Sequence, residues 1–185
     1  MRNLSTLLCA LAFAASAQAV DVGGVNIPDK AKVGGQDLVL NGAGLRTRAI
    51  FKVYVGSLYL PLKANTAGAV YAKAPRRIQL NMLRDVGADQ MIEALAEGVT
   101  QSNSAADAAA VKAQSDQLAS ILKSMGQLKE GNVLTFDYVD GGTQVGLNGA
   151  AKGTIPGEAF NKALSNAWIG DKPVQDDLKK AMLGS

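Results

Sequence analysis

The spacing of apolar residues changes along this chain, and that change limits the possible folds more than any other feature. Gln36–Leu40, Ala49–Leu60 and Arg76–Leu83 are rich in β-forming residues or alternate between apolar and polar, as strands do. Between Asp89 and Thr100 the apolar residues instead recur at helical spacing, and a second helical segment begins at Ser104. Strands therefore come first along the chain and helices follow.

The strand pattern returns in the second half. Val133–Val139 and Thr143–Leu147 flank the turn sequence Asp140-Gly141-Gly142, which predicts a β-hairpin. Pro156 then begins one predicted helix and Pro173 another. Hairpin-connected strands, with helices grouped between them and at the end, predict an α+β fold in which a large antiparallel sheet is covered by a layer of helices.

Local signals predict where several elements begin and end. Asn41–Gly44 is rich in turn-forming residues and is expected to follow the first strand as a turn. Asp89 is a plausible N-cap, and Ser104 with Asp107 forms an imperfect capping box at the second helix. Gly126 fits as the C-cap of that helix. Neither an internal repeat nor an interdomain linker is visible, so we expect a single domain.

The N-terminal segment has the three parts of a secretory signal. These are Arg2 as the basic start, Leu4–Ala15 as the apolar stretch and Ala17–Ala19 as the small-x-small cleavage site. Cleavage after residues 1–19 would leave 20–185 as one domain, and no segment of that remainder is apolar enough to span a membrane. The sequence therefore predicts a periplasmic or secreted protein.

The residue types that are missing exclude several kinds of chemistry. The chain has no histidine, so it cannot form a Ser-His-Asp triad, a Cys-His pair or an imidazole metal site. Its one cysteine, Cys9, lies in the predicted signal segment, which leaves no thiolate ligand in the mature chain. We therefore expect neither a metal nor a cofactor.

Charge gives little support for nucleic-acid binding. The formal net charge is only +3, and a backbone-binding surface needs clustered Lys and Arg. Two groups of basic residues do cluster, and both are interpreted first as solvated strand ends beside the sheet. They are Arg46, Arg48 and Lys52, and Lys73, Arg76, Arg77 and Arg84.

The first basic group has a second interpretation. Unbroken strand alternation would place Arg46, Arg48, Lys52 and Tyr54 on one sheet face and Phe51, with Val53, on the other. A guanidinium and a phenol on one face can hold a carboxylate, because Arg supplies a fork of N–H donors and Tyr supplies one O–H. Spacing alone leaves the alternative open, in which Arg46 is a solvated strand end and Tyr54 belongs to the core.

Three other candidates have simpler explanations. Glu93 and Glu97 lie one helical turn apart and are expected on a solvated face. The glycines of Gly141–Gly153 do not follow a strand and open a helix, so they are interpreted as hairpin turns and not as a phosphate-binding loop. Trp168 ends an apolar stripe and is expected in the core.

Four segments in this order resemble the chalcone isomerase-like superfamily, in particular its bacterial exported branch. They are Leu40–Arg46, Phe51–Leu60, Gly153–Phe160 and Ala163–Gly170, and the resemblance extends over about residues 25 to 183. It implies an open-faced β-sandwich in which a ligand cleft lies between a large antiparallel sheet and a helical layer. That architecture agrees with the order of strands and helices that the apolar spacing predicts.

The resemblance also implies roles for individual residues. Arg46 matches the Arg with which plant chalcone isomerases hold the ring-closing oxygen of their substrate. The hydroxyl and amide groups of that site are replaced here by Tyr54, Gln90 or Met91, Glu97 and Ala167. The fatty-acid-binding branch instead pairs the same Arg with a Tyr on the following strand, and Arg46 with Tyr54 resembles that arrangement.

The favoured interpretation is a non-catalytic, exported protein that binds a fatty acid or similar amphipathic carboxylate through Arg46 and Tyr54. The first alternative is an isomerase, an intramolecular lyase of the chalcone isomerase type, with Arg46 as electrophilic stabiliser. The second is an envelope accessory protein that acts through a protein partner. The missing hydroxyls favour binding over catalysis, and the sequence names no protein partner.

Overall fold

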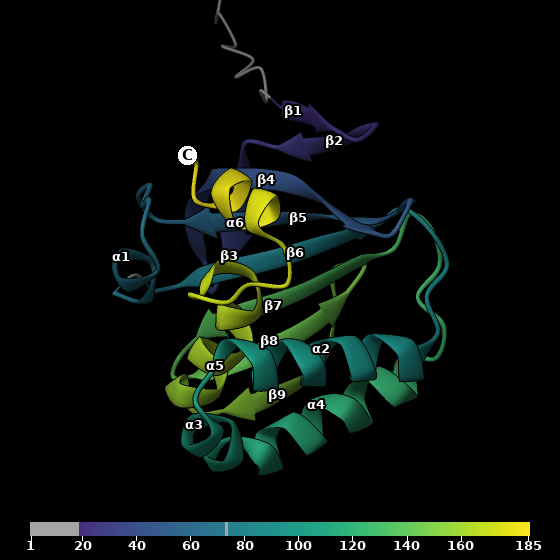
Figure 1. Cartoon of the computed structure of the whole chain (residues 1–185). Helices are drawn as coiled ribbons and strands as arrows, with labels where there is room; N and C mark the ends of the chain where they lie inside the picture. Colours follow the sequence, from purple (N-terminus) through teal and green to yellow (C-terminus); the bar gives the residue numbers. More distant parts are fainter. Residues whose placement is uncertain (1–18, 73) are drawn as a thin grey trace, which may run out of the picture.

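A seven-stranded antiparallel sheet forms the body of the molecule (Figure 1). The computed structural model describes residues 19–72 and 74–185. Each strand of the sheet pairs with the next one along the chain, in the order β3-β4-β5-β6-β7-β8-β9. The strands are β3 (Lys30–Val33), β4 (Gln36–Arg48), β5 (Phe51–Leu60), β6 (Arg76–Met82), β7 (Val133–Val139), β8 (Gly142–Leu147) and β9 (Ala150–Pro156).

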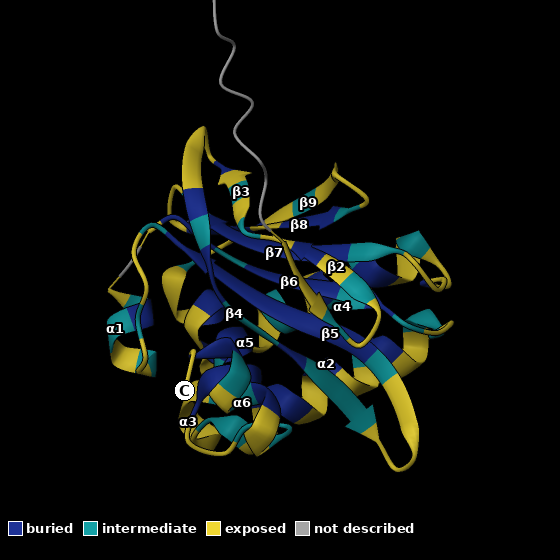
Figure 2. Cartoon of the chain, turned by 90° about the horizontal axis from the view of Figure 1, so that it is seen from above, coloured by how far each residue is buried: buried dark blue, intermediate teal, exposed yellow. Residues whose placement is uncertain are grey.

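Helices cover one face of this sheet, as the sequence predicts. They are α1 (Ala67–Tyr71), α2 (Ala88–Ser102), α3 (Ala105–Ala110), α4 (Lys112–Met125), α5 (Glu158–Ile169) and α6 (Asp176–Met182). The main core lies between the two layers, where Ile78, Leu80 and Met82 of β6 meet Phe160 and Trp168 of α5. In Figure 2 the central strands are mostly buried, while the helices expose their outer sides.

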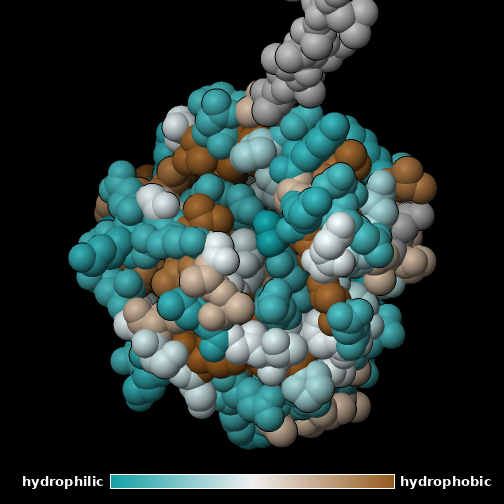
Figure 3. Space-filling model, turned by 180° about the vertical axis from the view of Figure 1, so that it is seen from behind, coloured by the Kyte–Doolittle hydropathy of each residue, from teal (hydrophilic) through white to brown (hydrophobic). Residues whose placement is uncertain are grey.

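The opposite face of the sheet is only partly covered. A separate hairpin of β1 (Ala19–Val22) and β2 (Val25–Pro28) packs there, and Ile27 joins a second apolar cluster with Val55 and Tyr59. The Tyr59 hydroxyl donates to the Pro28 carbonyl at 3.0 Å. This side, seen in Figure 3, is largely hydrophilic with separate apolar patches. The architecture is therefore the open-faced sandwich that the resemblance implies.

The expected turn at Asn41–Gly44 is wrong, because β4 runs through it without a break. Asn41 forms a β-bulge, since Leu40 pairs with Tyr59 and Gly42 already pairs with Leu58. The Asn41 amide donates to the carbonyls of Ala64, at 2.9 Å, and Met182, at 2.8 Å. Its polar side chain thus anchors two distant segments to the strand.

The glycines of this segment serve close packing instead of a turn. A Cβ at Gly42 would lie 2.0 Å from the Ala181 carbonyl oxygen, and one at Gly44 would lie 2.6 Å from the Ala181 Cβ. Only glycine therefore lets α6 approach β4 at this distance. Turn-forming composition and close helix packing select the same residue type, which explains the wrong prediction.

Helix boundaries follow the sequence signals in part. The N-cap of α2 is Gly87, so Asp89 lies in the first turn and does not cap the helix. Ser104 does cap α3, accepting from the Asp107 backbone N–H at 3.1 Å. Gly126 ends α4 with a positive φ, as expected, but the single helix expected between Ser104 and Gly126 is divided at Val111 into α3 and α4.

One strand was not predicted, and one predicted segment lies almost entirely outside the described residues. The residue pattern predicts no strand after Leu147, yet residues 150–156 form β9 at the edge of the sheet. The proposed signal segment, residues 1–19, lies outside the described part of the chain except for Ala19. Within the described ranges, no helix is long and apolar enough to cross a membrane.

Candidate functional site

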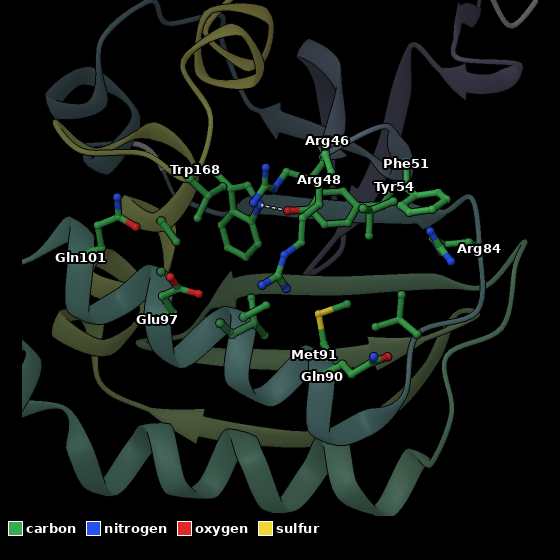
Figure 4. Close-up of a pocket in the computed structure, with 18 of the residues that line it drawn as sticks. Arg46, Arg48, Phe51, Tyr54, Arg84, Gln90, Met91, Glu97, Gln101 and Trp168 are labelled. Atoms are coloured by element: carbon green, nitrogen blue, oxygen red, sulfur yellow. Dashed lines mark hydrogen bonds between the residues drawn. The ribbon is translucent and has the colours of Figure 1, made fainter.

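A cavity of about 600 Å³ lies between the β4–β5 hairpin and α2, and Trp168 of α5 contributes to its wall (Figure 4). Its volume falls within the range of about 300 to 1,000 Å³ that is typical of small-molecule sites. Apolar side chains from both layers form much of the wall, among them Val53, Met91 and Leu95. Polar side chains also come from both layers, with Arg46, Arg48 and Tyr54 on the strands and Gln90, Glu97 and Gln101 on α2, so the cavity is amphipathic.

Strand pairing places the two residues of the predicted carboxylate clamp opposite each other. Arg46 of β4 and Tyr54 of β5 are direct register partners, and both line the cavity. Facing residues of an antiparallel pair have adjacent side chains on one sheet face. The structure therefore brings Arg46 and Tyr54 together, and their role toward a ligand stays a prediction.

A β-bulge changes the rest of the expected face. Arg46 pairs with Tyr54, but Thr47 pairs with Lys52, so Val53 is the extra residue of β5. Strand alternation is therefore broken, and the expectation that Lys52 shares the face of Tyr54 is wrong. Phe51, expected on the opposite face, is the residue that lines the cavity.

Arg46 is held by the segment that precedes α6. Its Nη1 donates to the Thr47 carbonyl at 2.6 Å and to Gln175 Oε1 at 3.3 Å. Gln175 also accepts from the Thr47 backbone N–H at 2.9 Å and donates to the Leu45 carbonyl at 3.1 Å, as an added strand would. Arg46 also interacts with the Tyr54 hydroxyl. A guanidinium has five N–H donors, which is more than these contacts use, so Arg46 keeps donors for a ligand.

Tyr54 is held from the helix side. It is 8% exposed, and its hydroxyl oxygen accepts from the Trp168 indole N–H at 2.9 Å. Burial raises the pKa of Tyr54 above its ordinary value, although the Trp168 hydrogen bond and the Arg46 charge oppose that shift. The hydroxyl therefore stays protonated at neutral pH, and because its oxygen already accepts from Trp168, its hydrogen is available to donate to a ligand.

Two more guanidinium groups, which the clamp prediction did not include, line the cavity. Arg48 lies on the cavity face of β4, and Arg84 follows β6 with its Cζ 4.5 Å from the Phe51 ring centroid. The carboxylates of Asp85 and Glu97 also line the wall, so the cavity carries three Arg against two acids. The alternation that selects Arg46 also indicates Arg48, two residues further on. No sequence signal places Arg84 there.

Of the second basic group predicted from the sequence, Lys73 lies outside the described residues, and the described members do not form one cluster. Arg76 is only 3% exposed and donates from Nε to Asn161 Oδ1 at 3.0 Å, so its assignment as a solvated strand end is wrong. Burial lowers the pKa of Arg76. Arg77 lies on the other face of β6 in a two-pronged pair with Asp137, with both distances 2.6 Å. Strand alternation separates these neighbours.

The family follows from the whole chain. Residues 19–184 match the family described as chalcone isomerase-like. The chain belongs to the chalcone isomerase-like family. Among solved structures, a fatty-acid binding protein of Arabidopsis thaliana matches with a TM-score of 0.68 and 16% sequence identity, over 86% of this chain and 92% of that one. No curated protein matches the sequence. The structural likeness confirms the chalcone isomerase-like fold.

The positions that the resemblance aligns with catalytic ones of plant chalcone isomerases lie in the cavity wall. Gln90, Met91, Glu97 and Ala167 line it together with Tyr54. Of the described lining residues, Tyr54 alone carries a hydroxyl. The described chain also contains no cluster of three or more acidic side chains that could hold a metal ion. The polar side chains that line the cavity are guanidinium, carboxylate, amide and phenol groups.

Proposed function

We propose that this chalcone isomerase-like protein binds a fatty acid or a similar amphipathic carboxylate and does not transform it. The observation that carries the proposal is the pairing of Arg46 with Tyr54 in a cavity to which both layers also contribute apolar side chains. The fold shared with the fatty-acid binding protein of Arabidopsis thaliana supports it.

The clamp replaces the water that a carboxylate loses on entering the cavity. Desolvating a charge is costly unless charge-assisted hydrogen bonds replace its hydration. In our proposal the remaining N–H groups of Arg46 donate to the carboxylate, and the Tyr54 hydroxyl supplies a further donor. The acyl chain then packs against Val53, Met91 and Leu95.

The same cavity argues against catalysis. General acid–base or water-organising chemistry needs positioned groups that can donate or accept a proton. Met91 and Ala167 offer none at the matching positions, and the raised pKa of Tyr54 makes its hydroxyl a poor base. Of the matching positions, Glu97 is the one that carries a carboxylate, so the isomerase alternative depends on Arg46 together with Glu97.

We also propose that the protein acts in the periplasm or after secretion, because residues 1–19 have the pattern of a cleaved signal. N-terminal sequencing of the soluble protein tests this. A mature start at Val20 is expected, and a soluble product that retains Met1 would contradict export.

Calorimetry with saturated acids from laurate to stearate tests ligand binding. We expect Arg46→Ala to weaken binding by about 30- to 700-fold, equivalent to about 2 to 4 kcal/mol. Arg46→Lys should fall between the wild type and Arg46→Ala, because Lys keeps the charge but loses the planar fork. The methyl esters of the same acids should bind weakly.

Lys152→Ala is the matched control, since Lys152 is exposed on β9 and its loss changes the net charge by the same amount. It should leave affinity unchanged. If the wild type binds none of the acids, or if a folded Arg46→Ala protein binds them equally well, the clamp is wrong.

A further inference from the structure

The tip of the β4–β5 hairpin exposes two adjacent apolar side chains. Ile50 is 88% exposed and Phe51 is 51% exposed. Of the described residues, Val20 and Leu62 are the other large apolar side chains that are strongly exposed, and neither has such a neighbour. Figure 2 shows this tip as an exposed loop that projects beyond the body of the protein. Single exposed apolar residues are ordinary, but an apolar pair on a projecting loop indicates a contact surface.

Cations surround this apolar tip. Arg48 and Lys52 flank the pair in the hairpin, and both are exposed. Arg84, also exposed, lies against Phe51 from the neighbouring strand end. Beside it, the Asp85 Oδ1 already accepts from the Glu130 backbone N–H at 2.9 Å. Apolar residues ringed by Lys and Arg are typical of surfaces that enter the interface of anionic membranes.

The tip and the cavity are continuous. Arg48, Ala49 and Phe51 belong to the hairpin end and also line the cavity opening. A surface that contacts the tip therefore contacts the mouth of the cavity as well. Two residues on a convex loop are also far fewer than the roughly 20 to 30 residues per side of a stable protein interface.

We propose that the hairpin tip docks on an anionic lipid bilayer. Ile50 and Phe51 enter the boundary between headgroups and acyl chains, while Arg48, Lys52 and Arg84 contact lipid phosphates. Docking places this end of the cavity at the boundary between headgroups and acyl chains, so that an amphipathic ligand passes between bilayer and cavity without crossing water. The docking surface stands on its own observations, and the ligand exchange rests on the proposed function.

Co-sedimentation with vesicles tests the docking. The wild type should bind vesicles of phosphatidylcholine with phosphatidylglycerol more tightly than vesicles of phosphatidylcholine alone, and salt should weaken that binding. Ile50→Ser should reduce vesicle binding by about tenfold or more. Lys52→Glu should reduce binding to the anionic vesicles by about 5- to 30-fold.

Two control variants match these changes. Leu62→Ser removes another strongly exposed apolar side chain, 67% exposed, beyond the other end of β5, and Lys152→Glu makes the same charge reversal on β9. Both should bind vesicles as the wild type does. A control variant that loses as much binding as its partner would overturn the inference, because the tip would then have no special role.

Calorimetry with laurate in water separates this inference from the proposed function. Ile50 does not line the cavity, so Ile50→Ser should bind laurate normally while it loses vesicle binding. A wild type that binds laurate but no anionic vesicle overturns the docking alone. A wild type that binds vesicles but no acid overturns the proposed function and leaves the docking in place. If Ile50→Ser instead converts a dimer into a monomer in gel filtration, the tip is a contact between copies and the inference is wrong.

Discussion

Removing the Tyr54 hydroxyl should destabilise the protein, because that oxygen is the partner of a buried donor. The Trp168 side chain is 1% exposed and its indole N–H donates to Tyr54 at 2.9 Å. In Tyr54→Phe the N–H loses its partner while the ring volume is kept. An unsatisfied buried donor costs about 1 to 3 kcal/mol. For a chain of this size, about 2 kcal/mol corresponds to a Tm lower by about 4 to 8 °C.

A double-mutant cycle assigns that cost to the hydrogen bond. Denaturant unfolding of Tyr54→Phe is compared in the wild-type background and in a Trp168→Phe background, where no indole donor exists. We expect the change to cost at least about 1 kcal/mol less in the second background. Equal costs in both, or an unchanged midpoint in the single variant, would refute the reasoning, since the indole N–H would then have another partner such as water in the cavity.

Other expected outcomes follow from the packing and the titrating groups. Gly42→Ala should lower the free energy of unfolding by more than about 2 kcal/mol in denaturant unfolding, because its Cβ would meet an α6 carbonyl at 2.0 Å. Gly68→Ala, with open space around the new Cβ, should not. Burial raises the pKa of Tyr54, Tyr59 and Tyr71, so stability should be full below about pH 10 and fall above it, as the unfolded chain ionises first. Equal unfolding free energies at pH 8 and pH 11 would contradict this. The protein should not accelerate chalcone cyclisation, and a rate abolished by Arg46→Ala would favour the isomerase alternative.

The layer architecture could be predicted because it depends on short-range patterns. The alternation in Arg76–Leu83 and the turn residues of Asp140–Gly142 act over a few residues, and the structure keeps both. The turn expected at Asn41–Gly44 is wrong, because its glycines are needed for close packing against α6, which lies far away in sequence. Local propensity cannot distinguish a glycine needed for a turn from one needed for close packing.

The residues of the candidate site could be predicted from the sequence only where strand alternation is unbroken. Arg46 and Tyr54 lie opposite each other as the clamp requires, because the bulge at Val53 lies between Tyr54 and the hairpin tip. Between the bulge and the hairpin tip, Phe51 and Lys52 lie on the sheet faces opposite to those expected. Nothing in the residue pattern indicates an extra residue at Val53. Gln175, which orients Arg46, could not be found at all, because the two are 129 residues apart.

That long separation has a consequence for the order of folding. The bond between Gln175 and Arg46 can form only after all seven strands of the sheet have been synthesised, and α6 must then pack on the glycines of β4. Contacts between such distant segments are slow to form, because loop closure costs entropy before any contact compensates it. In a nascent or partly unfolded chain Arg46 is therefore not yet oriented by Gln175. The cavity becomes able to bind its ligand only when folding is complete. Recovery of ligand affinity during refolding should thus lag behind recovery of helical circular dichroism.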